Sequence, residues 1–287
     1  MKALFIVNPA SGPNWKKLPK AWIKKISDTP NVEIVETDHA GHASDLARQA
    51  VNDNFDSVIA VGGDGTVHEI GTALIGSNVA LGIIPMGSGN GYARSMGIPL
   101  NVDKAIDHAL TAEPRSVDTG MVNGFPFLGV AGWGFDALVA HKFAETRGRG
   151  LINYVKTSMV EFGKYKAAKF KISVGDERIK QKAFAVVAAN TPEYGNNARI
   201  SPDSEPDDGL LELVIVDPLK AVDMADMTRR LFTGQMLGSK FVKVLRAESF
   251  KVNTKKEMAH LDGEPIFSER KTIVKVVPSS LFVLRGN

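Results

Sequence analysis

Apolar runs of strand length alternate with amphipathic stretches over the first 120 residues of the chain. Three runs, at residues 2–7, 57–61 and 79–85, are almost entirely apolar, and residues 32–37 give a further candidate. Short continuous apolar runs are typical of strands that are buried on both faces. The pattern therefore predicts four strands in this part of the chain.

Between these runs, apolar residues recur with the spacing of one helix face. The stripes consist of Ala43, Leu46, Ala47, Ala50 and Val51, then Val67, Ile70, Leu74 and Ile75, then Val102, Ala105, Ile106, Ala109 and Leu110. Strands that alternate with helices pair in parallel and are covered on both faces. We therefore expect an α/β domain with a parallel sheet over residues 1–121.

The second half of the chain has several short segments that are typical of strands, some of them with period-two alternation. They lie at residues 168–174, 182–190, 210–216, 240–247, 249–253, 272–277 and 281–285. Helical spacing occurs near residues 135–166, where two helices fit, and near residues 219–236. Short alternating strands favour antiparallel pairing, so we expect a β-rich, mainly antiparallel domain over residues 122–279.

The chain has 287 residues, of which 44% are hydrophobic and 23% charged, as in globular proteins with a sizeable core. It has no cysteine, which excludes disulfides and thiolate metal sites and fits a reducing cytoplasm. The start lacks the pattern of a signal peptide, and no apolar run reaches the roughly 18 residues of a membrane span. We therefore expect a cytoplasmic protein.

The net charge of +3 is small but unevenly distributed. Residues 142–182 contain eleven Lys or Arg against four Asp or Glu. A solvated surface is one interpretation, and attraction to an anionic membrane surface is the other. Aromatic residues are sparse in this segment, so the sequence does not predict a nucleic-acid partner.

Three glycine-bearing loops follow predicted strands: NPASG at Asn8–Gly12, GGDGT at Gly62–Thr66 and PMGSGNGYAR at Pro85–Arg94. Ligands of parallel sheets bind at the carboxyl ends of the strands, where all three loops would lie. Their backbone N–H groups, and the helix starts after two of them, favour phosphate. Each loop alone also fits an ordinary turn. Neither a P-loop motif nor the GxGxxG Rossmann fingerprint is present.

Asp64 introduces a negative charge into the second of these loops. A carboxylate among phosphate-binding glycines repels phosphate unless a cation lies between them. Because Mg²⁺ binds carboxylates, water and substrate phosphates together, Asp64 is a candidate for holding Mg²⁺ against a nucleotide phosphate. The alternative is that Asp64 caps the following helix near Thr66.

Taken together, these motifs resemble the diacylglycerol kinase catalytic-domain family, which includes bacterial lipid kinases, sphingosine kinases and ceramide kinases. The resemblance rests first on VNPASG, VGGDGTVHEI and IPMGSGNGYAR, which occur in that order. It continues through SVDTG at 116–120, GVAGWGFDA at 129–137, YGNNARISP at 194–202, DDGLLEL at 207–213 and LDGEP at 261–265. It spans nearly the whole chain, whereas GGDGT alone is similar to NAD kinases and 6-phosphofructokinases as well.

The resemblance implies ATP- and Mg²⁺-dependent phosphorylation of a lipid hydroxyl, diacylglycerol-like or sphingoid. It implies an N-terminal α/β ATP-binding domain, to which residues 280–287 return, a β-rich lipid-substrate domain, and an active site in the cleft between them. Asp64 and Asp118 would organise the magnesium and water network. The residues implied for ATP are Asn8, Gly62, Gly63, Asp64, Gly65, Thr66, Gly87, Ser88, Gly89, Asn90 and Arg94. Arg94 fits a surface helix position equally well.

The LDGEP segment supplies a candidate proton acceptor. Phosphoryl transfer needs a group that takes the hydroxyl proton, and the resemblance assigns this role to Glu264, with Asp64 as the rival base. Asp262 and Glu264 would share a face on a strand, but not necessarily in a turn around Gly263. A polar hairpin turn without catalytic function is the alternative for this segment.

The resemblance also implies a second, structural Mg²⁺ at the DDGLL segment. Asp208 would give a side-chain ligand, and the backbone carbonyls of Glu205 and Leu210 would add to it. The alternative is an Asp-Gly turn before a strand. His39 and His42 are three residues apart with no third ligand in sight in the sequence, and we interpret both as surface residues.

Two other functions stay open at this point: an NAD kinase, and a nucleotide- or lipid-binding regulator without catalysis. Asp64, Asp118 and Glu264 are all present, which argues against the regulator. The sequence does not name the acceptor lipid. Because a lipid substrate lies in a bilayer, we expect peripheral association with an anionic membrane. Bacterial members of the family are often dimers, so the resemblance also suggests a homodimer.

Overall fold

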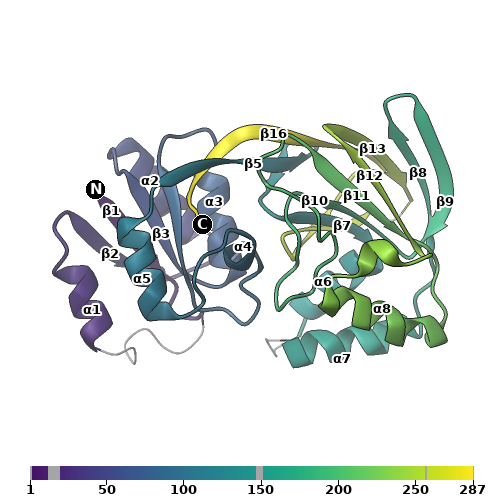
Figure 1. Ribbon diagram of the computed structural model, residues 1–287, viewed down its shortest axis with the longest axis horizontal. Coiled ribbons are helices and arrows are strands. Elements are labelled where there is room, and N and C mark those ends of the chain that lie inside the picture. The colour runs from purple at the N-terminus through teal and green to yellow at the C-terminus, as the bar shows by residue number, and fades with distance from the viewer. Residues whose placement is uncertain (1, 12–19, 147–150, 256, 287) are drawn as a thin grey trace. The chain divides into compact units, whose positions relative to one another are not determined.

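The computed structural model describes residues 2–11, 20–146, 151–255 and 257–286 (Figure 1). The chain divides into two compact units, one of Met1–Val117 with Ser279–Asn287 and one of Asp118–Pro278. Gly12 of the first predicted loop, and Arg147 and Arg149 of the basic segment, lie outside the described residues.

The first unit is built on a parallel sheet with the strand order β2-β1-β3-β4. These strands are β1 (Ala3–Val7), β2 (Val32–Glu36), β3 (Ser57–Gly62) and β4 (Ala80–Pro85). Every residue of β1, β3 and β4 is buried, as expected for a parallel sheet. The end of β16 (Lys271–Leu284) extends the sheet, because Phe282 and Val283 pair in parallel with β4.

Helices cover this parallel sheet on both faces. They are α1 (Lys20–Ser27), α2 (His42–Asn52), α3 (Asp64–Leu74), α4 (Gly91–Ser95) and α5 (Val102–Thr111). Phe5 and Ile59 of the sheet pack against Ile26 of α1 and Ile106 of α5. Neighbouring strand residues point to the opposite face, where α2 contacts β1, and α3 contacts β3 and β4.

The second unit is an antiparallel β-sandwich. One sheet has the order β12-β11-β10-β7-β14-β15, and the facing strands have the order β16-β13-β8-β9. Trp133 and Leu213 of the first sheet share a buried core with Phe170 and Phe250 of the facing strands. β5 (Pro114–Val122) begins in the first unit and continues into the second. The other strands of the second unit, besides β16, are β6 (Phe125–Phe127), β7 (Val130–Gly134), β8 (Ala168–Val174), β9 (Glu177–Ala183), β10 (Ala185–Ala189), β11 (Leu211–Val216), β12 (Val242–Ala247), β13 (Ser249–Thr254), β14 (Met258–Leu261) and β15 (Glu264–Phe267).

A second core lies on the other face of the six-stranded sheet. Its helices are α6 (Phe135–Ala144), α7 (Leu151–Phe162), α8 (Ala221–Thr233) and the 3₁₀ helix η2 (Met236–Gly238). Phe135 and Val139 of α6 and Met227 of α8 pack with Val187 and Val214 of the sheet. None of the helices in the described ranges combines the length and the hydropathy that a membrane span requires.

The predicted fold class is confirmed, since a parallel α/β unit is followed by an antiparallel β-sandwich. The segments predicted at 272–277 and 281–285 prove to be one strand, β16. Strands β5, β6, β7, β9, β14 and β15 and helix α1 were not predicted. β9 was missed because only Ile179 gives its sequence an apolar character before Ala183, and β14 and β15 because they have only four residues each.

Candidate active site

The first two glycine-bearing loops are joined by hydrogen bonds at the carboxyl edge of the parallel sheet. The Asn8 N–H donates to the Val61 carbonyl at 3.0 Å, and Asn8 Nδ2 donates to Thr66 Oγ1, also at 3.0 Å. Asn8 Oδ1 accepts from the Ala10 N–H at 2.9 Å and so shapes its own loop. Asn8 therefore fixes the NPASG loop against the start of α3.

The second and third loops touch through their glycines. A Cβ atom added at Gly87 would lie 2.7 Å from the Gly63 Cα, and one at Gly62 would lie 2.5 Å from Thr66 Oγ1. A side chain at Gly87 would force these two loops apart, and one at Gly62 would collide with Thr66 of its own loop, because real Cβ contacts are longer. Gly87 is thus required for packing between the loops and Gly62 for packing within its own loop, in addition to any ligand they approach.

Asn90 is the residue that shapes the third loop. It has a φ of 50°, its Oδ1 accepts from the Gly87 N–H at 2.9 Å, and its Nδ2 donates to the Gly87 carbonyl at 2.8 Å. Ser88 lies exposed between them, and Arg94 is half-buried in α4. Asn90 thus has a clear structural role, and the predicted ATP contacts of this loop stay predictions.

Asp64 is the first residue of α3, and Gly63 is the N-cap. The alternative interpretation of Asp64 as the helix cap is therefore not supported by its position. At this place its carboxylate is half-buried and lies in the first turn of a helix, whose N-terminus carries partial positive charge. The same partial charge favours phosphate, so the position is compatible with the predicted nucleotide site.

Asp118 is buried in the second unit and is held at several atoms. Its Oδ2 accepts from the Gly209 N–H at 2.7 Å, its N–H donates to the Pro206 carbonyl at 2.6 Å, and its carbonyl accepts from Asn190 Nδ2 at 2.9 Å. The structure thus joins Asp118 to the DDGLL segment, a contact that sequence reasoning did not predict. Its predicted role beside Asp64 stays a prediction.

Asp262 and Glu264 have different environments although they are two residues apart. Asp262 and Gly263, with φ values of 51° and 90°, form the two-residue turn between β14 and β15. The Asp262 carboxylate accepts backbone N–H groups of Leu128, Gly129 and Val130 at 2.8 to 3.0 Å. Glu264 is exposed as the first residue of β15. Asp262 therefore anchors the hairpin, which leaves Glu264 as the accessible carboxylate of this segment.

A buried polar cluster supports the same hairpin. His260 Nε2 lies 2.7 Å from Asp136 Oδ2, Tyr194 Oη donates to that oxygen at 2.9 Å, and the Gly263 N–H donates to His260 Nδ1 at 3.2 Å. Burial disfavours the charged imidazole, but the Asp136 and Asp262 carboxylates together outweigh burial, and the pKa of His260 lies above its usual value. Sequence reasoning missed this cluster, although its residues lie in or next to the three motifs GVAGWGFDA, YGNNARISP and LDGEP.

Asp208, the side chain predicted to bind a structural metal, pairs with a protein cation. The guanidinium of Arg246 pairs with the Asp208 carboxylate and, through Nε at 3.0 Å, with Glu212. Asp208 Oδ1 also accepts from the Leu210 N–H at 2.9 Å, and Glu205 is exposed. Burial raises the pKa of the Glu212 carboxyl, while Ser204 and Arg246 oppose this shift. A metal at Asp208 would have to displace Arg246, so this arrangement does not fit a second Mg²⁺ as it stands.

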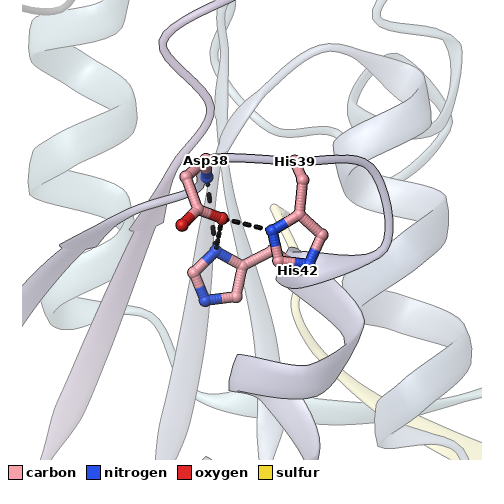
Figure 2. A group of neighbouring side chains, drawn as sticks. All are labelled: Asp38, His39 and His42. Atoms are coloured by element: carbon pink, nitrogen blue, oxygen red, sulfur yellow. Dashed lines mark hydrogen bonds and ion pairs between the residues drawn. The ribbon is translucent and has the colours of Figure 1, made fainter.

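Figure 2 shows that Asp38 supplies the third polar group beside His39 and His42, which the sequence analysis did not find. One carboxylate oxygen of Asp38 lies 2.7 Å from His42 Nδ1 and also contacts His39 Nδ1. The two rings are stacked with planes 6° apart, so their in-plane lone pairs do not converge on one point. The side chains of Asp38 and His39 are 75% and 62% exposed. We therefore interpret the cluster as a hydrogen-bonded surface turn.

Comparison with known proteins relates both units to one family. The family model described as the diacylglycerol kinase catalytic domain matches residues 2–122. The family model described as the YegS C-terminal NAD kinase β-sandwich-like domain matches residues 129–285.

Proteins of similar sequence agree with these matches. The diacylglycerol kinase of Bacillus subtilis strain 168 is 29% identical over 275 residues, covering 92% of this chain and 89% of that protein. The diacylglycerol kinase of Mycobacterium tuberculosis strain H37Rv is 30% identical over 265 residues, with coverages of 88% and 84%. A Pseudomonas aeruginosa UCBPP-PA14 protein named as a YegS-like lipid kinase is 31% identical over 254 residues, with coverages of 85% and 81%.

A solved structure has the same fold. The crystal structure of a diacylglycerol kinase from Bacillus anthracis strain Sterne superimposes with a TM-score of 0.76 at 20% identity, covering 99% of this chain and 97% of that one. The family model and the sequence relatives show that the chain belongs to the diacylglycerol kinase catalytic-domain family of lipid kinases.

Proposed function

We propose that this protein transfers the terminal phosphate of ATP to the hydroxyl group of a diacylglycerol-like or sphingoid lipid, with Mg²⁺ as cofactor. The observation that carries the proposal is the carboxyl edge of the parallel sheet. There, Asn8, Gly63 and Gly87 bring three loops into contact, and Asp64 opens the following helix.

The edge of this sheet has the chemistry that a nucleotide phosphate requires. Backbone N–H groups and the N-terminus of α3 attract anions, whereas Asp64 repels them unless a cation is bound as well. Asp64 would hold Mg²⁺, which neutralises the phosphate charge when it is bound. Asn8 and Asn90 keep the loops in one conformation, so little ordering remains to be done when ATP binds.

Glu264 is the group that we assign to the acceptor hydroxyl. It is exposed at the start of β15, and the Asp262 anchor fixes the turn before it. Within hydrogen-bond reach of the lipid hydroxyl, its carboxylate would accept the proton as the phosphate is transferred. Asp64 is the other carboxylate that qualifies, and kinetics of the two variants separate them.

The test is a transfer assay with the full chain, radiolabelled ATP and Mg²⁺. Diacylglycerol, a sphingoid base, ceramide and phosphatidylglycerol are each offered in detergent micelles, with NAD in a parallel reaction. We expect label in a lipid product, no label in NAD, and loss of transfer with a chelator. Label in NAD alone would overturn the proposal in favour of an NAD kinase. Absence of ATP turnover with every acceptor would favour a regulator that only binds.

Glu264→Gln tests in the same assay whether Glu264 is the base. It keeps the shape of the side chain but removes its basicity, so turnover should fall by about a hundredfold or more while the affinity for ATP is unchanged. Unchanged turnover would mean that Asp64, and not Glu264, is the base.

A further inference from the structure

The strands β8, β9, β13 and β16 present a strongly basic outer surface in the second unit. Their inward residues, among them Phe170, Phe250 and Val274, are buried in the sandwich core, which fixes the alternate residues on the outer side. Eight of the twelve outer positions are basic, and we call these eight the basic face. It consists of Lys169, Lys171, Arg178, Lys180, Lys182, Lys251, Lys271 and Lys275.

The register places like charges opposite one another on the β8–β9 hairpin. Lys169 pairs with Lys182, and Lys171 pairs with Lys180. Side chains of directly opposed residues are neighbours, and like charges in such pairs destabilise a sheet. Two consecutive Lys–Lys pairs are therefore an arrangement that folding alone does not favour.

Nothing among the described residues neutralises this charge. The other four outer positions are Ser173, Ser249, Asn253 and Ile273, so the face contains no carboxylate. In the described part of the chain, no ion pair involves a residue of the basic face. Glu177 of the same hairpin pairs instead with Lys243 of β12. The face thus has an excess of positive charge held on one rigid sheet.

We infer that the basic face is the surface by which the protein docks on an anionic lipid bilayer. The inference rests on the proposed function, because the acceptor lipid lies in a bilayer and the protein must reach it. A sheet offers a broad surface to the plane of the bilayer, and lysine side chains place ammonium groups among lipid phosphates while their stems cover apolar surface. Ile273, which is 51% exposed, is the apolar residue within this surface.

A bilayer fits the composition of the face better than a single-stranded nucleic acid does. The twelve outer positions include no aromatic side chain on which bases could stack. The surface also differs from the segment 142–182 that the sequence suggested. Lys142 pairs with Glu145, whereas Lys251, Lys271 and Lys275 join the face from distant parts of the chain.

The test is co-sedimentation of the full chain with vesicles of phosphatidylglycerol and phosphatidylcholine, compared with pure phosphatidylcholine. We expect binding that increases with the anionic fraction and decreases with salt. Each lysine near anionic lipid strengthens binding about fivefold, so Lys171→Gln with Lys180→Gln should weaken it about 25-fold. Lys24→Gln with Lys104→Gln is the matched control, since both lysines are exposed on other surfaces of the chain. Equal vesicle binding of the two double variants would overturn the inference. It would also be overturned if duplex DNA or RNA bound the protein more tightly than the vesicles do, in a salt-dependent way that only the Lys171/Lys180 variant loses.

A single charge reversal distinguishes lost docking from lost folding. Lys171→Glu replaces a Lys–Lys pair with a Glu–Lys pair, so the thermal unfolding temperature should rise while vesicle binding falls. A fall in both would mean that Lys171 serves the fold, and the inference would then be wrong for this residue pair.

Kinase activity separates failure of this inference from failure of the proposed function. In detergent micelles the face variants should phosphorylate lipid as the unmodified protein does, whereas on anionic vesicles they should be slower. Vesicle binding is measured without ATP, so a protein that docks but never phosphorylates lipid would overturn only the proposed function. Equal rates of all variants on anionic vesicles would overturn the docking surface alone.

Discussion

The GGDGT loop of the first unit and the DDGLL segment of the second both contain an Asp-Gly step, but their glycines have different physical roles. In the first, Gly62 leaves no room for a Cβ atom because Thr66 lies against it, and Gly63 lies against Gly87 of the third loop. In the second, a Cβ atom at Gly209 would meet no other atom within 4 Å, but Gly209 has a φ of +76°, which residues with a side chain rarely adopt. The glycines of GGDGT are required by packing within the loop and against the third loop, and Gly209 is required by its backbone conformation.

The aspartates of these two Asp-Gly steps, Asp64 and Asp208, also have different surroundings. Asp64 begins a helix at a place where several loops meet, whereas Asp208 precedes a strand and is paired with Arg246. An aspartate that a protein cation already neutralises has little electrostatic need of a metal. We conclude that similar Asp-Gly motifs in one chain call for separate tests of metal binding.

Asp64→Asn should give the largest effect of these tests. Removing the charge while keeping the shape should lower turnover at least about a hundredfold, as when a group that stabilises transition-state charge is lost. The folded state should persist, because Gly63 rather than Asp64 is the N-cap. Initial rates with saturating ATP and lipid measure the change, and thermal unfolding checks the fold.

Asp103→Asn is the matched control, since Asp103 also lies in the first turn of a helix, α5. If Asp64 served only the helix dipole, both variants would lose about 0.3–1 kcal/mol of stability and neither would lose activity.

Gly87→Ala should separate the packing role of glycine from its conformational role. The added methyl group meets backbone of the GGDGT loop, so we expect a loss of about 1–3 kcal/mol of stability and weaker ATP binding. Gly209→Ala should cost a similar amount, about 1–2 kcal/mol, through strain at positive φ, but should not alter ATP affinity. Urea unfolding and titration with a fluorescent nucleotide measure the two quantities. Equal ATP affinity of both variants would show that contact between the loops is not required for nucleotide binding.

Much of this first unit could be predicted from the sequence, because its information is local. Buried runs such as residues 57–61, followed directly by GGDGT, specify both the strand and the loop at its end. The stripes Val67, Ile70 and Leu74 likewise specify the buried face of α3.

The second unit was less predictable, because its decisive contacts join distant residues. Asp262 accepts N–H groups about 130 positions earlier in the chain, and Asp136 meets His260 across 124 positions. Arg246 has no sequence pattern that pairs it with Asp208. The Lys–Lys pairs also depend on the register of β9, a strand whose polar sequence did not reveal it. Composition indicated an excess of basic residues there, but only the sheet shows which of them share a face.

Arg246→Met tests whether Asp208 binds a metal once its protein cation is removed. Without the guanidinium, Asp208 and the buried Glu212 lose their partner, so the thermal unfolding temperature should fall in the absence of metal. Mg²⁺ at ten times its dissociation constant would then restore about 1.4 kcal/mol. Thermal unfolding with and without millimolar Mg²⁺ measures this rescue.

Asp208→Ala is the control for that rescue, since it removes the predicted ligand. Its unfolding temperature should not depend on Mg²⁺. If Mg²⁺ stabilises the unmodified protein strongly and Asp208→Ala abolishes the effect, the metal displaces Arg246 and the structural Mg²⁺ site is real. If Mg²⁺ has no effect on any of these proteins, the predicted second site is absent.

The smallest expected effect is a pH dependence of stability from His260, which supports the hairpin of Glu264. The groups around its imidazole are Asp136, Tyr194 and Asp262, and the two carboxylates raise its pKa despite complete burial. A pKa that is higher in the folded than in the unfolded state favours folding when the group is protonated. This contribution is fully present below the unfolded value of about 6.5, and it is lost as pH rises through the folded pKa. Compared with His260→Gln, the unmodified protein should therefore lose free energy of unfolding as pH increases from 6 through that pKa. A difference between the two proteins that stays constant with pH would mean that His260 is neutral throughout and donates from Nε2 to Asp136 while Nδ1 accepts from Gly263.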